Sequence, residues 1–148
     1  MPDHELIQNF NTTISSFAAD MADLDETQAG LPLAPGKWSR KQILGHLIDS
    51  ASKNHQRFVR AAASESVSLP GYDQEFWVAT QKYSELEWKT LIAFWKGYNY
   101  HLLHVLKSLP DDAFKHRLKI GDGPEISLAD LAADYLRHLQ HHLRQIAG

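Results

Sequence analysis

The stretch YLRHLQHHLRQI, residues 135–146, decides how the chain folds. It contains His138 and His142, which lie four residues apart and therefore project from one face of a helix. At 100° per residue, His142 lies about 50° from the middle of the apolar stripe of this helix and His138 about 90° from it, whereas His141 points nearly the opposite way. The stripe consists of Leu128, Tyr135, Leu139, Leu143 and Ile146. His142 should therefore face the interior, and His138 should lie at its edge.

Histidines spaced in this way hold the metal ion in one class of zinc enzymes. Histidine is also favoured near the C-terminal end of a helix, where its protonated form interacts with the helix dipole. The pair by itself therefore leaves open whether it binds a metal.

A third histidine, His46, connects this pair to the topology of the chain. Ser39 followed by Gln42 is a capping-box pattern, which predicts a helix running to about residue 63. His46 lies about 10 Å along that helix at 1.5 Å per residue. His138 and His142 lie about 13 Å and 7 Å from the end of the last helix if that helix ends near residue 147. These depths coincide only if the two helices run antiparallel.

Helical periodicity extends over most of the chain and predicts four helices of roughly 20 residues. We expect an all-α four-helix bundle in the order up-down-down-up, because an up-down-up-down order would make the second and fourth helices parallel. A long crossover over residues 65–83, with one short helix after Pro70-Gly71, would connect the second helix to the third.

Caps and turns predict the other boundaries. Ser84 and Ser127 each precede an acidic residue by three positions, so we expect them to cap the third and fourth helices. Residues 25–37 contain two prolines and two glycines and are expected to form a loop. The turn at residues 121–124 is expected to close a tight hairpin, with short strand pieces around residues 116–126.

The composition limits the classes of function. The chain has 148 residues, of which 43% are apolar and 22% charged, which fits one globular domain over residues 1–148. The formal net charge is −3 and basic residues are scattered, which disfavours nucleic acid and membranes as partners. With no secretory signal pattern and no membrane-spanning stretch, we expect a cytoplasmic protein. The chain has no cysteine, which excludes thiol nucleophiles and cysteine-based metal sites.

The surroundings of His46 allow two interpretations. His46 lies outside the apolar arc of its helix, on a polar stripe with Ser50, Lys53 and Arg57. The stripe is either a solvated face or the lining of a cleft, in which Arg57 would hold an anionic group of a substrate or cosubstrate. Periodicity alone does not decide between the two.

The other histidines lack a comparable arrangement. His4 lies near the N-terminal end and should be exposed. For the rest we favour surface positions or hydrogen-bonded core positions, although two of them, His101 and His104, lie one turn apart and could form a site. The histidines in question are His55, His101, His104 and His116.

Three segments resemble the DinB-like superfamily of metal-dependent enzymes, and the resemblance covers essentially the whole chain. They are KWSRKQILGHLIDSASKNHQRF (37–58), PGYDQEFW (70–77) and HLQHHLRQI (138–146). The resemblance implies an up-down-down-up bundle, with a divalent metal held by one histidine of the second helix and two of the fourth. The matching residues are His46, His138 and His142. It also implies a small-molecule substrate, and either hydrolysis or transfer of a low-molecular-weight thiol.

A metal held by three imidazoles would keep an open coordination position, at which it could activate water or a small-molecule thiol. Imidazole suits zinc, nickel, iron and copper. Asp73 and Glu75 are candidates for a general base or for orienting a ligand; alternatively, they cap the short helix after Pro70-Gly71. Asp49 and Asp134 are candidates for hydrogen-bond partners of the ligands' second ring nitrogens.

Two non-catalytic alternatives also fit the sequence. In one, the metal is structural and its fourth position is closed, for example by Asp73 or His101. In the other, the chain is a helical interaction module without a metal. Tyr72, Trp77 and Trp38 are candidates for the wall of an apolar pocket. Exposed apolar residues would also fit a homodimer, although the sequence does not indicate which face would pair.

Overall fold

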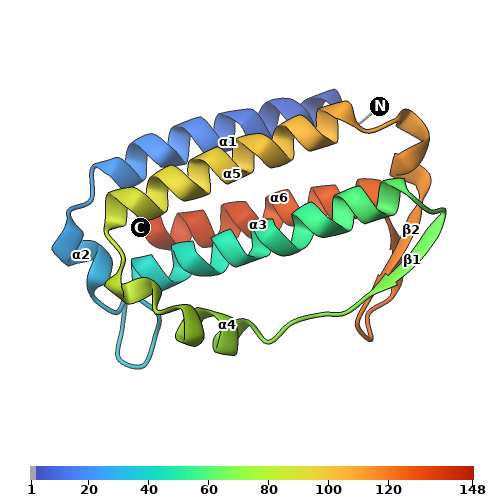
Figure 1. The fold of residues 1–148 in the computed structure, drawn as a ribbon. Coiled ribbons are helices and arrows are strands. Elements are labelled where there is room, and N and C mark those ends of the chain that lie inside the picture. Colours follow the sequence, from blue (N-terminus) through green and yellow to red (C-terminus); the bar gives the residue numbers. More distant parts are fainter. Residues whose placement is uncertain (1–2) are drawn as a thin grey trace.

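Four long helices lie side by side in the computed structural model, which describes residues 3–148 (Figure 1). They are α1 (His4–Ala22), α3 (Arg40–Ala62), α5 (Trp88–Ser108) and α6 (Leu128–Ala147). α1 and α6 run in one direction and α3 and α5 in the other, which confirms the predicted up-down-down-up order (Figure 1). α3 packs antiparallel to α6 and parallel to α5.

The crossover between α3 and α5 runs along the bundle and contains a strand and a short helix (Figure 1). The elements are β1 (Ser66–Leu69), α4 (Gln74–Gln81) and the 3-10 turn η1 (Tyr83–Glu85). A second group precedes α6 and consists of the 3-10 turn η2 (Asp111–Lys115), β2 (Arg117–Ile120) and β3 (Glu125–Ser127). β2 and β3 form the predicted antiparallel hairpin, and β1 adds to β2 in parallel. β1 was not predicted from the sequence, because its partner strand lies on a distant part of the chain.

Two of the three predicted serine caps are present. Ser39 and Gln42 form a complete capping box, with the Gln42 amide donating to Ser39 Oγ at 3.2 Å and the Ser39 amide donating to Gln42 Oε1 at 2.9 Å. Ser127 caps α6 by accepting from the Asp130 amide at 3.1 Å. These caps satisfy amide groups that have no partner within the helix.

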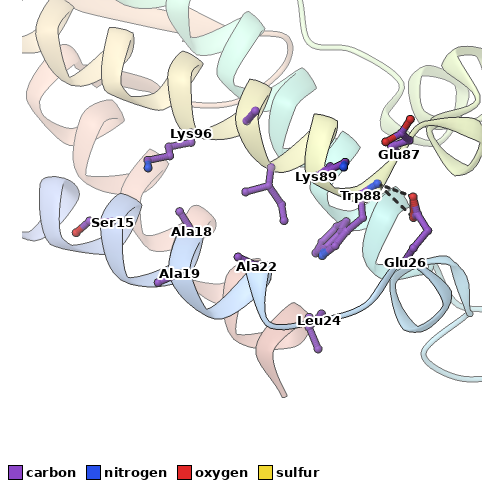
Figure 2. Close-up of a pocket in the computed structure, with 12 residues that line it drawn as sticks. Ser15, Ala18, Ala19, Ala22, Leu24, Glu26, Glu87, Trp88, Lys89 and Lys96 are labelled. Atoms are coloured by element: carbon purple, nitrogen blue, oxygen red, sulfur yellow. Dashed lines mark hydrogen bonds between the residues drawn. The ribbon is translucent and has the colours of Figure 1, made fainter.

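The predicted cap at Ser84 was wrong. Ser84 lies within η1, and α5 begins at Trp88. The amide of Trp88 donates instead to the carboxylate of Glu26, at 3.0 Å to Oε1 (Figure 2). Glu26 belongs to α2 (Glu26–Gly30), a short helix that the sequence analysis assigned to a loop. Asp25 and Gln28 form a capping box at its start, so a local signal for this helix was present.

The apolar faces of the four long helices meet in one core. Tyr135 lies in this core, where its ring packs against Phe10 and Phe58 and its hydroxyl donates to Asn99 Oδ1 at 2.5 Å. Burying one large apolar side chain contributes about 1.5–3 kcal/mol, so the core stabilises the bundle chiefly through its area. No helix within residues 3–148 is long and apolar enough to span a lipid bilayer.

Gly45 allows the end of the crossover to pack directly on α3. A Cβ atom at this position would overlap the ring of Tyr83. The Tyr83 hydroxyl donates to Asp49 Oδ1 at 2.6 Å, and Gln81 Nε2 donates to the same oxygen at 2.8 Å. The crossover is therefore fastened to the part of α3 that carries His46.

We expect Gly45→Ala to destabilise the protein by about 1–3 kcal/mol, because the methyl group forces the Tyr83 ring away from α3. The matched control is Gly97→Ala, another mid-helix glycine, where an added Cβ meets nothing within 4 Å. That control should be neutral or stabilising by up to about 1 kcal/mol, because alanine is the better helix former. Urea unfolding measures both, and equal stability of the two variants would contradict this packing argument.

Candidate metal centre

Three histidines meet where α3 lies against α6. The Nε2 atoms of His46 and His138 are 3.4 Å apart, and one ring nitrogen from each of His46, His138 and His142 lies within 4.8 Å of the other two. The ring centroids are 4.6–5.2 Å apart, and each pair of rings is nearly perpendicular. The antiparallel pairing inferred from the sequence thus brings these residues together.

This arrangement has the dimensions of a coordination site. Zinc binds imidazole nitrogen at about 2.0–2.1 Å, so two nitrogens of a tetrahedral site lie about 3.4 Å apart and the ring centroids about 5 Å apart. The His46–His138 nitrogen distance and all three centroid distances match these values. The donor set, three imidazoles and no carboxylate, suits a borderline divalent ion.

Burial keeps the three imidazoles neutral, which is the form that binds metal. Desolvation lowers the pKa of His46 to about 4, with a further contribution from His142 and His138. Desolvation and the neighbouring His142 lower the pKa of His138 to about 4 as well. The pKa of His142 is also lowered, mainly by burial, although its hydrogen bond to Gln145 opposes this.

The polar stripe of α3 is a buried lining and not a solvated face. His46 is only 1% exposed, Ser50 is buried, and Lys53 and Arg57 are half-buried. The reason is that α5, α6 and the crossover cover α3 on several sides. The ring of Trp38 packs against that of His46 with centroids 5.3 Å apart.

The predicted carboxylate partners of the ligands were wrong. Asp49 accepts from Tyr83 and Gln81, and Asp134 forms an ion pair with Arg137 on the same helix. The observed partner is Gln145, whose Oε1 lies 2.8 Å from Nδ1 of His142 and leaves Nε2 for a metal. The sequence carried a weak signal for this contact, since the two residues are three positions apart on a helix.

Nδ1 of His46 is a buried atom with no hydrogen-bond partner among the described residues. Nε2 of the same ring faces His138 at 3.4 Å. Leaving a buried polar atom unsatisfied costs about 1–3 kcal/mol. A metal bound through Nε2 would leave Nδ1 unsatisfied, so this atom needs a water molecule as its partner.

Two cavities adjoin the triad. One, of about 490 Å³, is lined by Trp38, Lys37, Glu75 and His142 among others. The other, of about 190 Å³, touches His138 and is lined by residues of α3, the crossover and α6. Its polar and aromatic lining includes Ser50, Asn54, Arg57, Tyr72 and Gln74.

The candidate helper residues have different environments. Asp73 caps α4 by accepting from the Phe76 amide at 3.2 Å, as the capping alternative predicted. Glu75 is exposed and lines the same cavity as His142. Of the aromatic residues, Trp38 and Tyr72 line the two cavities, whereas the ring of Trp77 lies 3.9 Å from Nζ of Lys53.

A larger cavity, of about 850 Å³, lies away from the triad between α1 and α5 (Figure 2). Its lining includes three alanines of α1, Trp88 of α5 and several lysines and glutamates (Figure 2). None of its lining residues is a histidine. Size alone therefore does not identify the site of chemistry in this molecule.

Comparison with known proteins assigns the chain to a family. It belongs to the DinB superfamily, whose family model matches residues 9–146. A protein of Oceanobacillus iheyensis named "Putative metal-dependent hydrolase" is 28% identical over 147 residues, covering 97% of this chain and 82% of that protein. A protein of Bacillus licheniformis with the same description is 27% identical over 126 residues, covering 84% of this chain and 72% of that protein.

Solved structures show the same fold. YfiT from Bacillus subtilis, described as "a probable metal-dependent hydrolase with an unusual four-helix bundle topology", has a TM-score of 0.86 at 22% identity, covering 96% of this chain and 82% of that one. A mycothiol-dependent maleylpyruvate isomerase has a TM-score of 0.80 at 15% identity, covering all of this chain and 62% of that one. At these identities the likeness establishes the architecture alone.

The low pKa values predict how the metal-free protein responds to acid. His46 has a pKa of about 4 when folded and an ordinary value of 6.5 when unfolded, so the unfolded chain binds more protons between these values. Stability should therefore be greatest above pH 6.5 and fall as the pH decreases towards 4. Urea unfolding in the presence of a chelator at pH 7 and pH 5 measures this loss. His46→Gln should lose less, and equal losses would contradict the assignment.

Gln145 should strengthen metal binding by orienting His142. We expect Gln145→Ala to weaken zinc binding about tenfold, as is typical when a partner of a ligating histidine is removed. Gln140→Ala is the matched control, because Gln140 lies on the same helix and bonds to Thr13 of α1. Competition with a chromophoric chelator gives both affinities. An unchanged affinity in Gln145→Ala would exclude this role.

Proposed function

We propose that the protein is a metal-dependent enzyme that acts on a small molecule at the His46–His138–His142 centre, with hydrolysis as its reaction. The observation that carries the proposal is the cluster of three neutral ring nitrogens within 4.8 Å of one another, beside cavities of about 490 and 190 Å³. The names of its relatives in Oceanobacillus iheyensis and Bacillus licheniformis support the same class. Zinc, nickel and iron(II) all suit these ligands.

The metal, when bound, would polarise the substrate and lower the pKa of bound water towards 7. Glu75 is the proposed general base, because it lines the cavity at His142 and its carboxylate is not the N-cap of α4. Asp73 is a weaker candidate, since its carboxylate already caps α4.

Arg57 is the proposed anchor for an anionic group of the substrate. It lines the cavity at His138, and no carboxylate among the described residues pairs with it. Burial lowers its pKa from the usual value, yet arginine remains charged at neutral pH. A half-buried, unpaired guanidinium favours a carboxylate or phosphate on the ligand.

Transfer of a small-molecule thiol is the second candidate reaction. The chain has no cysteine, so the thiol would come from a cosubstrate, for which the larger of the two cavities has room. The fold is shared with a mycothiol-dependent isomerase. Asp73 and His101 were the candidates for closing the fourth position of a structural metal. Asp73 caps α4 and His101 contacts His55, which supports an open position.

Activity assays on esters and amides, with and without added low-molecular-weight thiols, test the proposal. We expect His142→Gln to abolish turnover and Glu75→Gln to lower kcat by about 10²–10⁴-fold, the usual contribution of a general base. Asp73→Asn is the matched control, because asparagine also caps helices and should leave kcat unchanged. Turnover that persists in His142→Gln would contradict the proposed centre.

A comparison of KM for two substrates tests the role of Arg57. Arg57→Gln should raise KM at least tenfold for a substrate that bears a carboxylate and leave KM unchanged for its neutral methyl ester. Equal effects on both substrates would contradict an anionic anchor and indicate a structural role for Arg57.

A further inference from the structure

A second pair of histidines meets on the other side of α3. His55 of α3 and His101 of α5 have ring centroids 5.0 Å apart and an interplanar angle of 87°. Their helices are adjacent and parallel (Figure 1). His101 is exposed and His55 is half-buried, so the pair lies at the surface of the α3–α5 seam. From the sequence these residues were expected at the surface or in the core, because their contact joins two different helices and leaves no local pattern.

This pair has the ring geometry of the triad. The three ring pairs of the triad have centroid distances of 4.6, 4.9 and 5.2 Å and interplanar angles of 79–81°. The distance of 5.0 Å between the ring centroids of His55 and His101 falls within the range of the triad. An ion bound to two imidazole nitrogens at about 2.0–2.1 Å places the ring centroids about 5 Å apart.

The surroundings of His55 prepare it as a ligand. Its Nδ1 lies 2.9 Å from the hydroxyl of Tyr98, which fixes the ring and leaves Nε2 for a metal. Tyr98 is itself held by stacking against Phe94. Burial lowers the pKa of His55, with a smaller contribution from His101, which keeps the ring neutral near pH 7. Among the described residues no carboxylate forms a salt bridge with either histidine.

We propose that His55 and His101 form a second metal site, which binds a divalent first-row ion such as copper(II), nickel(II) or zinc and joins α3 to α5. Water completes the coordination. Copper(II) should bind most tightly, following the general order of affinities for nitrogen ligands. With two protein ligands, this site should be weaker than the triad. His104 is not assigned as a ligand, because its ring lies 6.2 Å from that of His101, farther than in any pair of the triad.

Calorimetric titration with copper(II) tests this site in a His46→Gln, His142→Gln background that removes the triad. We expect one equivalent to bind, and His101→Gln to weaken its binding at least tenfold. His4→Gln is the matched control, since it removes an imidazole from the start of α1 and should change nothing. Failure of the background protein to bind copper(II), or equal binding after His101→Gln, would overturn the proposal.

A second measurement keeps the proposal testable if the double variant does not fold. In the otherwise unchanged protein, His101→Gln should reduce the copper(II) bound by one equivalent. The electron paramagnetic resonance spectrum should lose the component that belongs to this site at the same time. An unchanged stoichiometry and spectrum would overturn the second site. This result is independent of the triad, because His101→Gln leaves His46, His138 and His142 in place.

Discussion

The antiparallel contact of α3 with α6 is the constraint on which the rest of the molecule depends. It places His46, 1% exposed, opposite His138 and His142, which are half-buried. Desolvation then keeps the rings of His46 and His138 neutral and leaves Nδ1 of His46 without a hydrogen-bond partner among the described residues. Such groups cost stability unless something binds them. In the proposed centre a divalent ion would bind one nitrogen of each ring, which gives the burial of these imidazoles a physical reason.

The long crossover makes this contact possible. It lets α5 run parallel to α3, so that the fourth helix returns antiparallel to both (Figure 1). The crossover also supplies the site, since Tyr72 and Glu75 line the cavities at His138 and His142. Its end is fastened to α3 by Tyr83, which packs over Gly45. The same parallel pairing of α3 with α5 brings together the second pair of histidines.

Local patterns predicted the four long helices and the caps at Ser39 and Ser127. The positions of His46, His138 and His142 along their helices predicted that the three residues meet. What the sequence analysis missed depends on contacts between distant residues. Glu26 replaces Ser84 as the cap of α5, and β1 pairs with a strand far along the chain. The burial of His46 was left undecided, because periodicity describes one apolar arc, whereas several elements cover α3. The contact of Asp49 with Tyr83 was not predicted either, because Tyr83 lies on the crossover and not on the same helix.

Anomalous diffraction at the zinc edge tests the three-histidine centre directly, with crystals of the His101→Gln protein grown with one equivalent of zinc. We expect a single strong peak about 2.1 Å from one ring nitrogen of each of His46, His138 and His142, with Nε2 as the ligand atom of His142. No peak between these rings, with zinc absent or bound elsewhere, would contradict it. The bundle would then be a helical module whose buried histidines serve another purpose.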